Sequence, residues 1–373
     1  MSLPHRKPTK QIHVGDVAVG GDARVSIQSM CTTRTTDPRA TVDQTLALAT
    51  AGADIVRITV PDDESAEGLA YIMWVLSSSQ RPVPIVADIH FRHDLALRAL
   101  EYGVQGMRLN PGNIKDAVKI REVAREAKAR GVPIRVGANA GSLHTDFLRK
   151  HGGPKPEALV ESAMWEVALL EDEGFFDIKI SVKHSDPYLM IESYRLLSET
   201  TDYPLHLGVT EAGTSYAGGI KSAVGIGTLL AEGIGDTIRV SLAADPLEEV
   251  KAGKQILKSL GLRREGLDVI ACPTCGRVEG DVISLATKVE EALAEIAAPI
   301  QVAVMGCLVN GPGEAREADV GLALSARGGT IFRKGQRIRE VDSDEMLEVL
   351  LEEARRIADE PEDDRKRLPV VPA

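Results

Sequence analysis

Residues 177–183 read Asp-Ile-Lys-Ile-Ser-Val-Lys, and their alternation gives the clearest indication of the fold class. Isoleucine or valine stands at every second position, and Lys179, Ser181 and Lys183 alternate with them. Such period-2 alternation of β-branched and polar residues predicts a strand with two unlike faces. We expect the apolar face to pack against helices and the polar face to line an interior site.

Seven further β-branched runs occur between residues 26 and 242, and helical segments separate them. Successive runs begin 23 to 43 residues apart, a spacing that is typical of βα units and too long for hairpins. Eight such units predict an α/β fold, a (β/α)8 TIM barrel. The predicted strands are Ser26–Met30, Asp54–Val60, Val83–Ile89, Gly106–Asn110, Ile134–Asn139, Asp177–Lys183, Leu205–Thr210 and Thr237–Leu242.

The sequence pattern changes after Gly261, where we expect a smaller α+β domain. The predicted domains are therefore residues 1–260 and 261–373, with a hairpin at Ile12–Gly21 across the barrel bottom and a disordered tail at Glu360–Ala373. The second domain is expected to contain helix Val278–Ala297, strand Ile300–Met305, the strand-like runs Val320–Ser325, Thr330–Arg333 and Gln336–Val341, and helix Asp344–Ala358.

Composition excludes several classes of protein. With 43% hydrophobic and 27% charged residues, the 373-residue chain has globular rather than disordered composition. A net charge of −11 and only 3% aromatic residues argue against a nucleic-acid partner. The first ten residues lack the apolar core of a signal peptide, and the most apolar stretch, Ile296–Val309, is too short to span a bilayer. We therefore expect a cytoplasmic protein without a membrane partner.

Lysine or arginine residues on five of the predicted strands share the inward-facing register. Cations gathered inside an apolar barrel repel one another and lose hydration, so we expect a small polyanionic ligand to neutralise them. The run Gly218–Ser222 could add amides at a helix N-terminus. The alternative is that the cations form barrel salt bridges with Asp54, Asp88, Asp177 or Glu211. The six cations are Arg57, Arg108, Arg135, Lys179, Lys183 and Arg239.

Glu211 follows the seventh predicted strand and therefore lies at the catalytic end of the expected barrel. Two roles suit a carboxyl group at this position. It is either a general acid with a raised pKa or the counter-charge of a neighbouring cation.

Three of the four cysteines form a constellation in the second domain. Cys272 and Cys275 are separated by two residues, and Cys307 follows an apolar strand. With Glu314 on the same loop as Cys307, the set suits either a [4Fe–4S] cluster with one exchangeable oxygen ligand or a structural zinc ion. Cys31 lies more than two hundred residues away and is expected to be a small buried hydrophobic residue.

Several motifs together resemble the IspG (GcpE) family of the methylerythritol phosphate isoprenoid pathway, over nearly the whole chain. The motifs are Gln28-Ser29-Met30, Arg34-Thr35-Thr36-Asp37, Ala51-Gly52-Ala53-Asp54-Ile55-Val56-Arg57, Arg108-Leu109-Asn110-Pro111-Gly112-Asn113, Thr210-Glu211-Ala212-Gly213, Cys272-Pro273-Thr274-Cys275-Gly276-Arg277 and Asn310-Gly311-Pro312-Gly313-Glu314.

The resemblance implies reductive dehydration and ring opening of 2-C-methyl-D-erythritol 2,4-cyclodiphosphate to hydroxymethylbutenyl diphosphate. It implies electrons from reduced flavodoxin or ferredoxin through a [4Fe–4S] cluster, and a homodimer in which the cluster domain of one subunit caps the barrel of the other. Family cluster ligands match Cys272, Cys275, Cys307 and Glu314, and Glu211 matches the carboxylate that handles protons. Family diphosphate contacts match Arg57, Arg108, Arg135, Asn139, Lys183 and Ser241.

Two other hypotheses follow from the residues. In the first, the barrel is a phosphosugar lyase or a pterin-binding transferase with a zinc-stabilised appendix, and Lys179 or Lys183 forms a Schiff base. In the second, the chain is a non-catalytic sensor of a phosphate ligand. Neither explains three cysteines together with the Asn-Gly-Pro-Gly-Glu loop.

Overall fold

The structure is a computed structural model that describes residues 5–79, 82–114, 116–309, 313 and 318–361. The chain divides into two compact units, Met1–Arg263 and Arg264–Ala373. The boundary predicted between residues 260 and 261 lies three residues before this division. Each unit has a hydrophobic core of its own.

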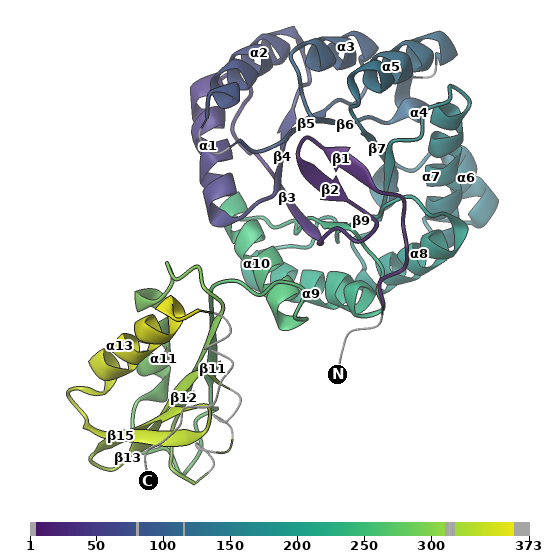
Figure 1. The fold of residues 1–373 in the computed structure, drawn as a ribbon. Helices are drawn as coiled ribbons and strands as arrows, with labels where there is room; N and C mark the ends of the chain where they lie inside the picture. The colour runs from purple at the N-terminus through teal and green to yellow at the C-terminus, as the bar shows by residue number, and fades with distance from the viewer. Residues whose placement is uncertain (1–4, 80–81, 115, 310–312, 314–317, 362–373) are drawn as a thin grey trace. The chain divides into compact units, whose positions relative to one another are not determined.

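The first unit is the predicted barrel of eight parallel strands (Figure 1). Its sheet order is β8-β7-β6-β5-β4-β3-β10-β9, and a bridge between Ile180 and Leu205 joins β8 to β9. The bounds of the last two strands are shorter than the sequence predicts. The strands are β3 (Ser26–Met30), β4 (Ile55–Thr59), β5 (Ile85–Asp88), β6 (Gly106–Arg108), β7 (Ile134–Asn139), β8 (Ile178–Lys183), β9 (His206–Leu207) and β10 (Thr237–Ile238).

Helices surround the strands, and local sequence signals set their ends. Asp62 and Asp186 cap helices α2 and α8 by accepting backbone hydrogen bonds from Ser65 and Tyr188, each at 2.8 Å. Helix α1 ends at Ala51, and Gly52 caps it with a left-handed φ of 108°. The helices are α1 (Pro38–Ala51), α2 (Asp63–Ser77), α3 (His93–Glu101), α4 (Pro111–Ile114), α5 (Ala117–Arg130), α6 (Thr145–His151), α7 (Pro156–Glu171), α8 (Pro187–Thr200), α9 (Ser215–Ala231) and α10 (Pro246–Ser259).

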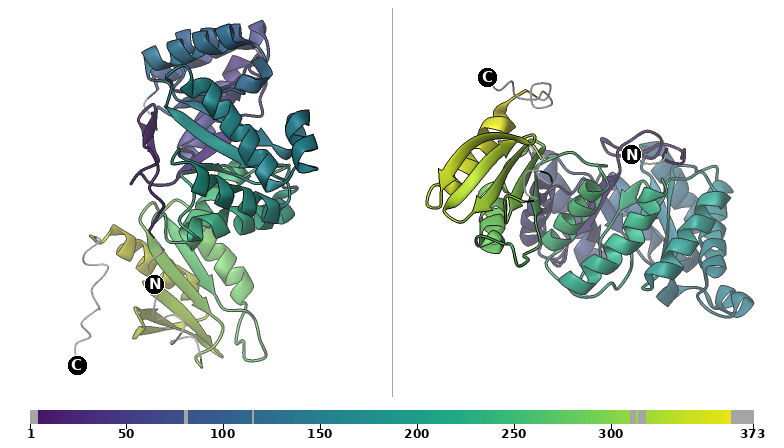
Figure 2. Two further views of the ribbon diagram at one scale, coloured as in Figure 1. Left: turned by 90° about the vertical axis from the view of Figure 1, so that its right-hand side faces the viewer. Right: turned by 90° about the horizontal axis from the view of Figure 1, so that it is seen from below.

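An antiparallel hairpin, β1 (Ile12–Val14) and β2 (Val17–Val19), closes one end of the barrel (Figures 1 and 2). Three of its buried residues form one apolar cluster with Ile55 of β4 and Val86 of β5. This confirms the predicted hairpin. Because the bottom of the barrel is filled by this cluster, the polar interior residues are left for the opposite, carboxyl end of the strands.

The second unit contains a five-stranded mixed sheet in the order β11-β12-β13-β14-β15. Strands β11 to β13 are parallel, and β13 to β15 are antiparallel. Two helices cover one core of the sheet. Strand β11 was not predicted from the sequence, and α11 is shorter than the predicted helix Val278–Ala297. The elements are β11 (Leu267–Ala271), α11 (Val282–Ala292), β12 (Ile300–Met305), β13 (Val320–Ser325), β14 (Gly328–Arg333), β15 (Gln336–Asp342) and α13 (Met346–Asp359).

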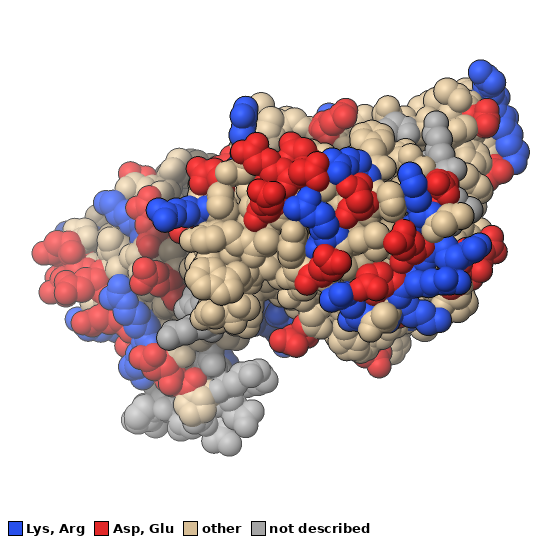
Figure 3. Space-filling view, turned by 90° about the horizontal axis from the view of Figure 1, so that it is seen from above, with Lys and Arg blue, Asp and Glu red and all other residues tan. Residues whose placement is uncertain are grey.

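Acidic and basic side chains are interspersed on the face that Figure 3 shows. Among the ion pairs of the first unit, Asp63 of α2 pairs with Arg92, which precedes α3, and with Arg98 of α3. None of the helices in the described ranges has the length and apolar character needed for a transmembrane span. Most of the predicted tail, residues 362–373, lies outside the described residues.

Candidate functional site

Four barrel strands and the segment after β10 each contribute one cation to a group at the carboxyl end of the barrel. Arg108 and Arg135 are register partners on β6 and β7, and the charges of all four arginines act on Lys183. Burial lowers the pKa of Lys183 well below its ordinary value, and the arginines lower it further. The predicted inward register of these residues is therefore observed. The group is Arg57 of β4, Arg108 of β6, Arg135 of β7, Lys183 of β8 and Arg239 after β10.

Asp88 of β5 lies between two of these arginines. Its carboxylate oxygens are 3.6 Å from Nε of Arg57 and 3.6 Å from Nε of Arg108. Burial alone would raise the pKa of Asp88, but the two guanidinium groups outweigh it and hold the pKa below its ordinary value. Asp88 is therefore an anion that orders the two arginines without cancelling the charge of the whole group.

Arg135 and Lys183 are the most enclosed of the cations, with exposed fractions of 6% and 7%. Arg135 donates a hydrogen bond to the hydroxyl of Ser181 on the neighbouring strand β8. Lys183 approaches Gly208, where an added Cβ would lie 3.0 Å from Nζ of the lysine and 2.6 Å from the carbonyl oxygen of Arg239. A side chain at residue 208 would therefore displace Lys183.

Arg239 is oriented by two side chains near the end of β10. It donates to the hydroxyl of Ser241 and lies 3.2 Å from a carboxylate oxygen of Glu249 on α10. Glu249 also accepts a hydrogen bond of 2.9 Å from the backbone of Leu242. Ser241 thus lies at the cation group, as the sequence analysis expected.

Asn139 ends β7 and lies opposite Lys183 in the β7–β8 register. Glu211, beyond β9, is exposed and has a φ of 52°, in the left-handed region that few residues other than glycine adopt. Such a backbone costs roughly 1–3 kcal/mol and is typical of functional sites. The loop therefore holds Glu211 at the same end of the barrel as the cations.

The described cations outnumber the carboxylates that they contact. Two buried carboxylates, those of Asp88 and Glu249, form ion pairs with the group. Asp54 instead pairs with Arg24 and Arg263, which lie outside the group. Among the described residues, Arg108 NH1, Arg135 Nε and Arg239 Nε are buried without a hydrogen-bond partner. Unpaired guanidinium nitrogens inside a protein are costly, so the arrangement is best suited to a multiply charged anion.

The structure bears on two further predictions about barrel residues, those for the run Gly218–Ser222 and for Lys179. The run Gly218–Ser222 was predicted to offer amides at a helix N-terminus, and this is wrong, because α9 begins at Ser215 and the Gly218 N–H already donates to Thr214 at 2.7 Å. Lys179, the Schiff-base candidate, is 3% exposed and donates to Thr237 at 3.3 Å. Burial lowers the pKa of Lys179 to about 7.

The cysteines of the second unit lie near the ends of two adjacent parallel strands. Cys272 follows β11 and Cys307 follows β12, and the N–H of Gly306 donates to Sγ of Cys272 at 3.0 Å. Cys275 is exposed in the turn after Cys272. No disulfide joins the four cysteines of the chain, all of which are described. Three thiols at one sheet end are the soft donors that iron–sulfur clusters and zinc require.

The fourth predicted ligand, Glu314, lies outside the described residues. Within the described ranges, no three His, Cys, Asp or Glu side chains converge closely enough to hold a metal ion. The three thiols fit a cluster by their donor chemistry, and the complete set of four ligands stays a prediction. Cys31 is 7% exposed and contacts the Thr45 hydroxyl at 3.3 Å, and burial raises the pKa of its thiol to about 11. This confirms the prediction of a buried Cys31.

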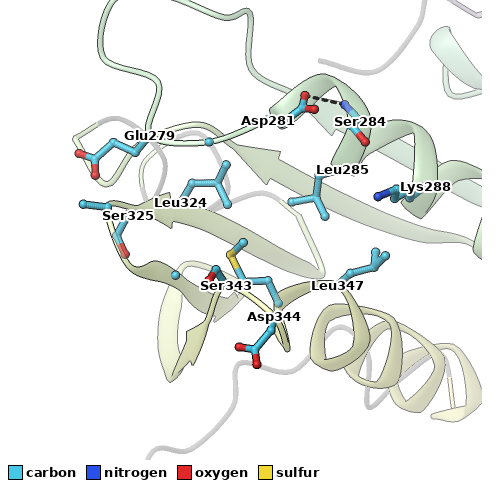
Figure 4. Close-up of a pocket in the computed structure, with 14 residues that line it drawn as sticks. Glu279, Asp281, Ser284, Leu285, Lys288, Leu324, Ser325, Ser343, Asp344 and Leu347 are labelled. Carbon is cyan, nitrogen blue, oxygen red and sulfur yellow. Dashed lines mark hydrogen bonds between the residues drawn. The ribbon is translucent and has the colours of Figure 1, made fainter.

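A pocket of about 460 Å³ lies between α11, the β13–β14 turn and the start of α13 (Figure 4). Leu285 and Leu324 line its floor, and Asp281 at its rim caps α11 by accepting from Ser284 at 3.0 Å. The carboxylates that line the pocket belong to helix starts and turns, where acidic residues are common. The pocket therefore adds no chemistry to the cysteine site.

Two buried glutamates beside the cations escaped the sequence analysis. Glu166 of α7 and Glu249 of α10 have exposed fractions of 3% and 5%, and both accept backbone hydrogen bonds from barrel residues. A glutamate on a helix normally indicates a solvated face. Helical periodicity could have identified Glu166, because Ser162, Ala163 and Leu159 share its buried face.

Two family models match this chain. The GcpE TIM-barrel domain matches residues 9–254, and the GcpE protein C-terminal domain matches residues 268–356. Together they cover most of both structural units.

Curated relatives are similar over nearly the full length. One from Frankia casuarinae is 54% identical over 359 residues, which cover 96% of this chain and 92% of the relative. One from Geobacter sulfurreducens is 54% identical over 94% of this chain and 98% of the relative. Both relatives are named 4-hydroxy-3-methylbut-2-en-1-yl diphosphate synthase (flavodoxin). Among solved structures, a dihydropteroate synthase from Stenotrophomonas maltophilia has a TM-score of 0.49 and 16% identity, covering 68% of this chain and 98% of that one.

Proposed function

The chain belongs to the GcpE family, and from this premise we propose that it is a 4-hydroxy-3-methylbut-2-en-1-yl diphosphate synthase. The proposed reaction is the reductive dehydration and ring opening of 2-C-methyl-D-erythritol 2,4-cyclodiphosphate to (E)-4-hydroxy-3-methylbut-2-enyl diphosphate. The observation that carries the proposal is the group of buried cations with unpaired guanidinium nitrogens at the open end of the barrel.

In this reaction two electrons enter, the ring bond between carbon and a diphosphate oxygen breaks, and a hydroxyl group leaves as water. Negative charge moves onto the diphosphate as the ring opens. Fixed guanidinium groups stabilise such developing charge without reorganisation. The proposed diphosphate contacts are Arg57, Arg108, Arg135, Asn139, Lys183 and Ser241.

The proposed cofactor is a [4Fe–4S] cluster held by Cys272, Cys275, Cys307 and Glu314. When bound, such a cluster supplies electrons singly from a reduced protein donor. The names of the relatives favour flavodoxin as the donor, with ferredoxin as the alternative. The N–H of Gly306 donates a hydrogen bond to Sγ of Cys272. Hydrogen bonds of this kind orient a thiolate ligand and tune its properties as a metal donor. Cysteines outside disulfides and a reduced donor suit the cytoplasm.

Purification under anaerobic conditions tests the function directly. We expect brown protein with iron and sulfide near four per chain, as the cluster formula requires, and product formation from the cyclodiphosphate with reduced flavodoxin. Colourless protein with stoichiometric zinc and no turnover would refute the proposal. Inorganic pyrophosphate binding measured separately distinguishes a failed cluster from a failed anion site.

Replacement of Glu211 tests its proposed role in protonating the departing hydroxyl oxygen. Glu211→Gln removes the proton but keeps the shape, so we expect kcat to fall about 10²- to 10³-fold. The visible spectrum and pyrophosphate affinity should match those of the wild type, because Glu211 is not among the proposed cluster ligands or diphosphate contacts. Glu232→Gln, on the surface after α9, is the matched control. Unchanged turnover of Glu211→Gln would remove this residue from the mechanism.

We further propose a homodimer in which the second domain of each subunit serves the barrel of its partner. The Arg135→Met and Cys275→Ser variants are each expected to be inactive. After subunit exchange, half of the dimers contain one of each variant, and one of their two sites is intact, so mixing should restore about a quarter of wild-type activity. Activity that stays at background after verified exchange would instead place both parts of the site in one chain.

A further inference from the structure

Glu166 is the buried acidic group next to the cation site that has no assigned role. It lies on α7 with 3% of its surface exposed, and its carboxylate accepts the backbone N–H of Gly137 on β7 at 3.0 Å. The side-chain amide of Asn110, just beyond β6, also hydrogen-bonds to this carboxylate. Gly137 lies midway between Arg135 and Asn139, which are two of the proposed diphosphate contacts.

The backbone around Gly137 explains why a side chain from α7 is needed there. The pairing of β6 with β7 ends at Arg108 and Arg135. The next backbone N–H of β7 on the β6 side, that of Gly137, therefore has no partner on β6. Gly137 has a φ of 151°, and an added Cβ would lie 1.9 Å from the carbonyl oxygen of Ser181. No other residue fits this backbone, and only Glu166 satisfies its N–H in the described structure.

We propose that Glu166 is a positioning residue of the anion site, which fixes β7 between Arg135 and Asn139 and exchanges a proton with solvent as the anion binds. The inference rests on the proposed anion-binding function. It adds that the site regulates its own positive charge through a group that does not touch the ligand.

The charges around Glu166 support proton exchange. Arg108 of β6 and Arg135 of β7 are the charged groups whose fields reach it, Asn110 contacts it beyond β6, and His144 at the start of α6 faces the adjoining cavity. Burial raises the pKa of Glu166 to about 7, although both arginines and the two hydrogen bonds oppose the change. A bound anion neutralises the arginines, so it should raise the pKa further and draw in a proton.

A path for that proton is present. A cavity of about 50 Å³ adjoins Glu166 and is lined by Asn110, Asn113, His144 and Trp165 among others. The volume is enough for a water molecule, and Oδ1 of Asn110 is buried there without a partner among the described residues. The His144 side chain is 47% exposed, so the cavity connects Glu166 with a group that solvent reaches.

Binding of inorganic pyrophosphate by the full-length holoenzyme tests the inference. Glu166→Gln mimics the protonated side chain at every pH, and Glu171→Gln is the matched control, because Glu171 lies on the same helix and accepts from Tyr203 at 2.8 Å, away from the cations. The titration of pyrophosphate, Lys179 and His90 changes the Kd of the wild type and that of the variant alike. This shared pH dependence cancels in the ratio of the wild-type Kd to the variant Kd.

For Glu166→Gln we expect this ratio to be near one at pH 6, where both side chains are uncharged. At pH 8 it should rise to about five, because the ionised wild-type carboxylate then opposes anion binding. For Glu171→Gln the ratio should stay near one at both pH values. A Glu166→Gln ratio that does not change with pH would overturn the inference.

A measurement on the wild type remains decisive if the variant fails to fold. Infrared difference spectra at pH 7 should show a carboxylic-acid C=O band gained when pyrophosphate binds. Absence of that band would also overturn the inference. If pyrophosphate does not bind the wild type at any pH, the proposed anion site itself fails, which is a distinguishable result.

Discussion

Arg135→Met is expected to lower kcat/KM by about 10³-fold while the variant folds at least as well as the wild type. Loss of one buried, charge-assisted contact to a phosphate group costs about 3–5 kcal/mol, and each 1.36 kcal/mol corresponds to tenfold in rate. Arg135 is 6% exposed, and both Arg57 and Arg108 oppose its charge. Removing it therefore leaves the most enclosed part of the proposed anion site with Lys183 alone as a donor.

The effect on stability should have the opposite sign. Burial lowers the pKa of Arg135 well below its ordinary value, and its Nε has no partner among the described residues. A methionine of similar length removes this unpaired charge, and such replacements are neutral or stabilising by about 1–4 kcal/mol. We expect the melting temperature of the free protein to be no lower than that of the wild type.

The surface variant Arg130→Met is the control, because Arg130 on α5 pairs, among the described residues, with Glu126 alone in an exposed i,i+4 bridge. Its kinetics should match those of the wild type. Steady-state rates with the cyclodiphosphate and a thermal melt without ligand measure the two effects. Should Arg135→Met lose stability and activity together, the residue would be part of the barrel framework and not of a ligand site.

The barrel was predictable because its strands alternate strongly, and the same alternation placed the cations inside. The strand Ile178–Lys183 shows this best, because each polar residue points inward and each apolar residue packs outward. Strand β11 was not predicted because four of its five residues are only partly buried, the fifth is exposed, and Asp268 interrupts the apolar pattern. Short edge strands receive their pairing from neighbours, which the local sequence does not encode.

The parts of the site that were not predictable depend on contacts distant in sequence. Helical periodicity is enough to place Glu166 on the buried face of α7, but its hydrogen bond to a strand residue 29 positions away follows only from the packing of α7 against the barrel. The left-handed backbone of Glu211 is likewise imposed by its loop, because glutamate has no intrinsic preference for that conformation. The local sequence pattern therefore identified the inward-facing cations, and the structure revealed the hydrogen bonds of the groups that orient them.

Cys275→Ser should abolish turnover and remove the iron. Cys275 is exposed in the turn that follows Cys272, and a serine hydroxyl is a harder, far less acidic donor than a thiol. We expect iron and sulfide in anaerobic preparations to fall below about one tenth of wild type, and product formation to fall at least about 10³-fold. Elemental analysis, visible absorbance and product assays with reduced flavodoxin measure the two losses.

Cys31→Ser provides the matched control, since it is the same substitution at a cysteine of the barrel. Its thiol is buried against Thr45, and burial raises its pKa to about 11, so it is a poor ligand and a poor nucleophile. Iron content and turnover of Cys31→Ser should stay within about twofold of wild type. Equal loss of iron in both variants would contradict the assignment of the cluster to the second unit.

The folding of Cys275→Ser decides between a catalytic cluster and a structural zinc ion. A structural zinc site supplies much of the folding free energy of its domain, so loss of a ligand unfolds that domain. The core of the second unit, however, consists of aliphatic residues from both helices and from all strands but β11, with Cys272 only at its edge. We therefore expect the circular dichroism and melting of Cys275→Ser to stay close to those of the wild type. Collapse of the second unit on loss of this one thiol would favour zinc.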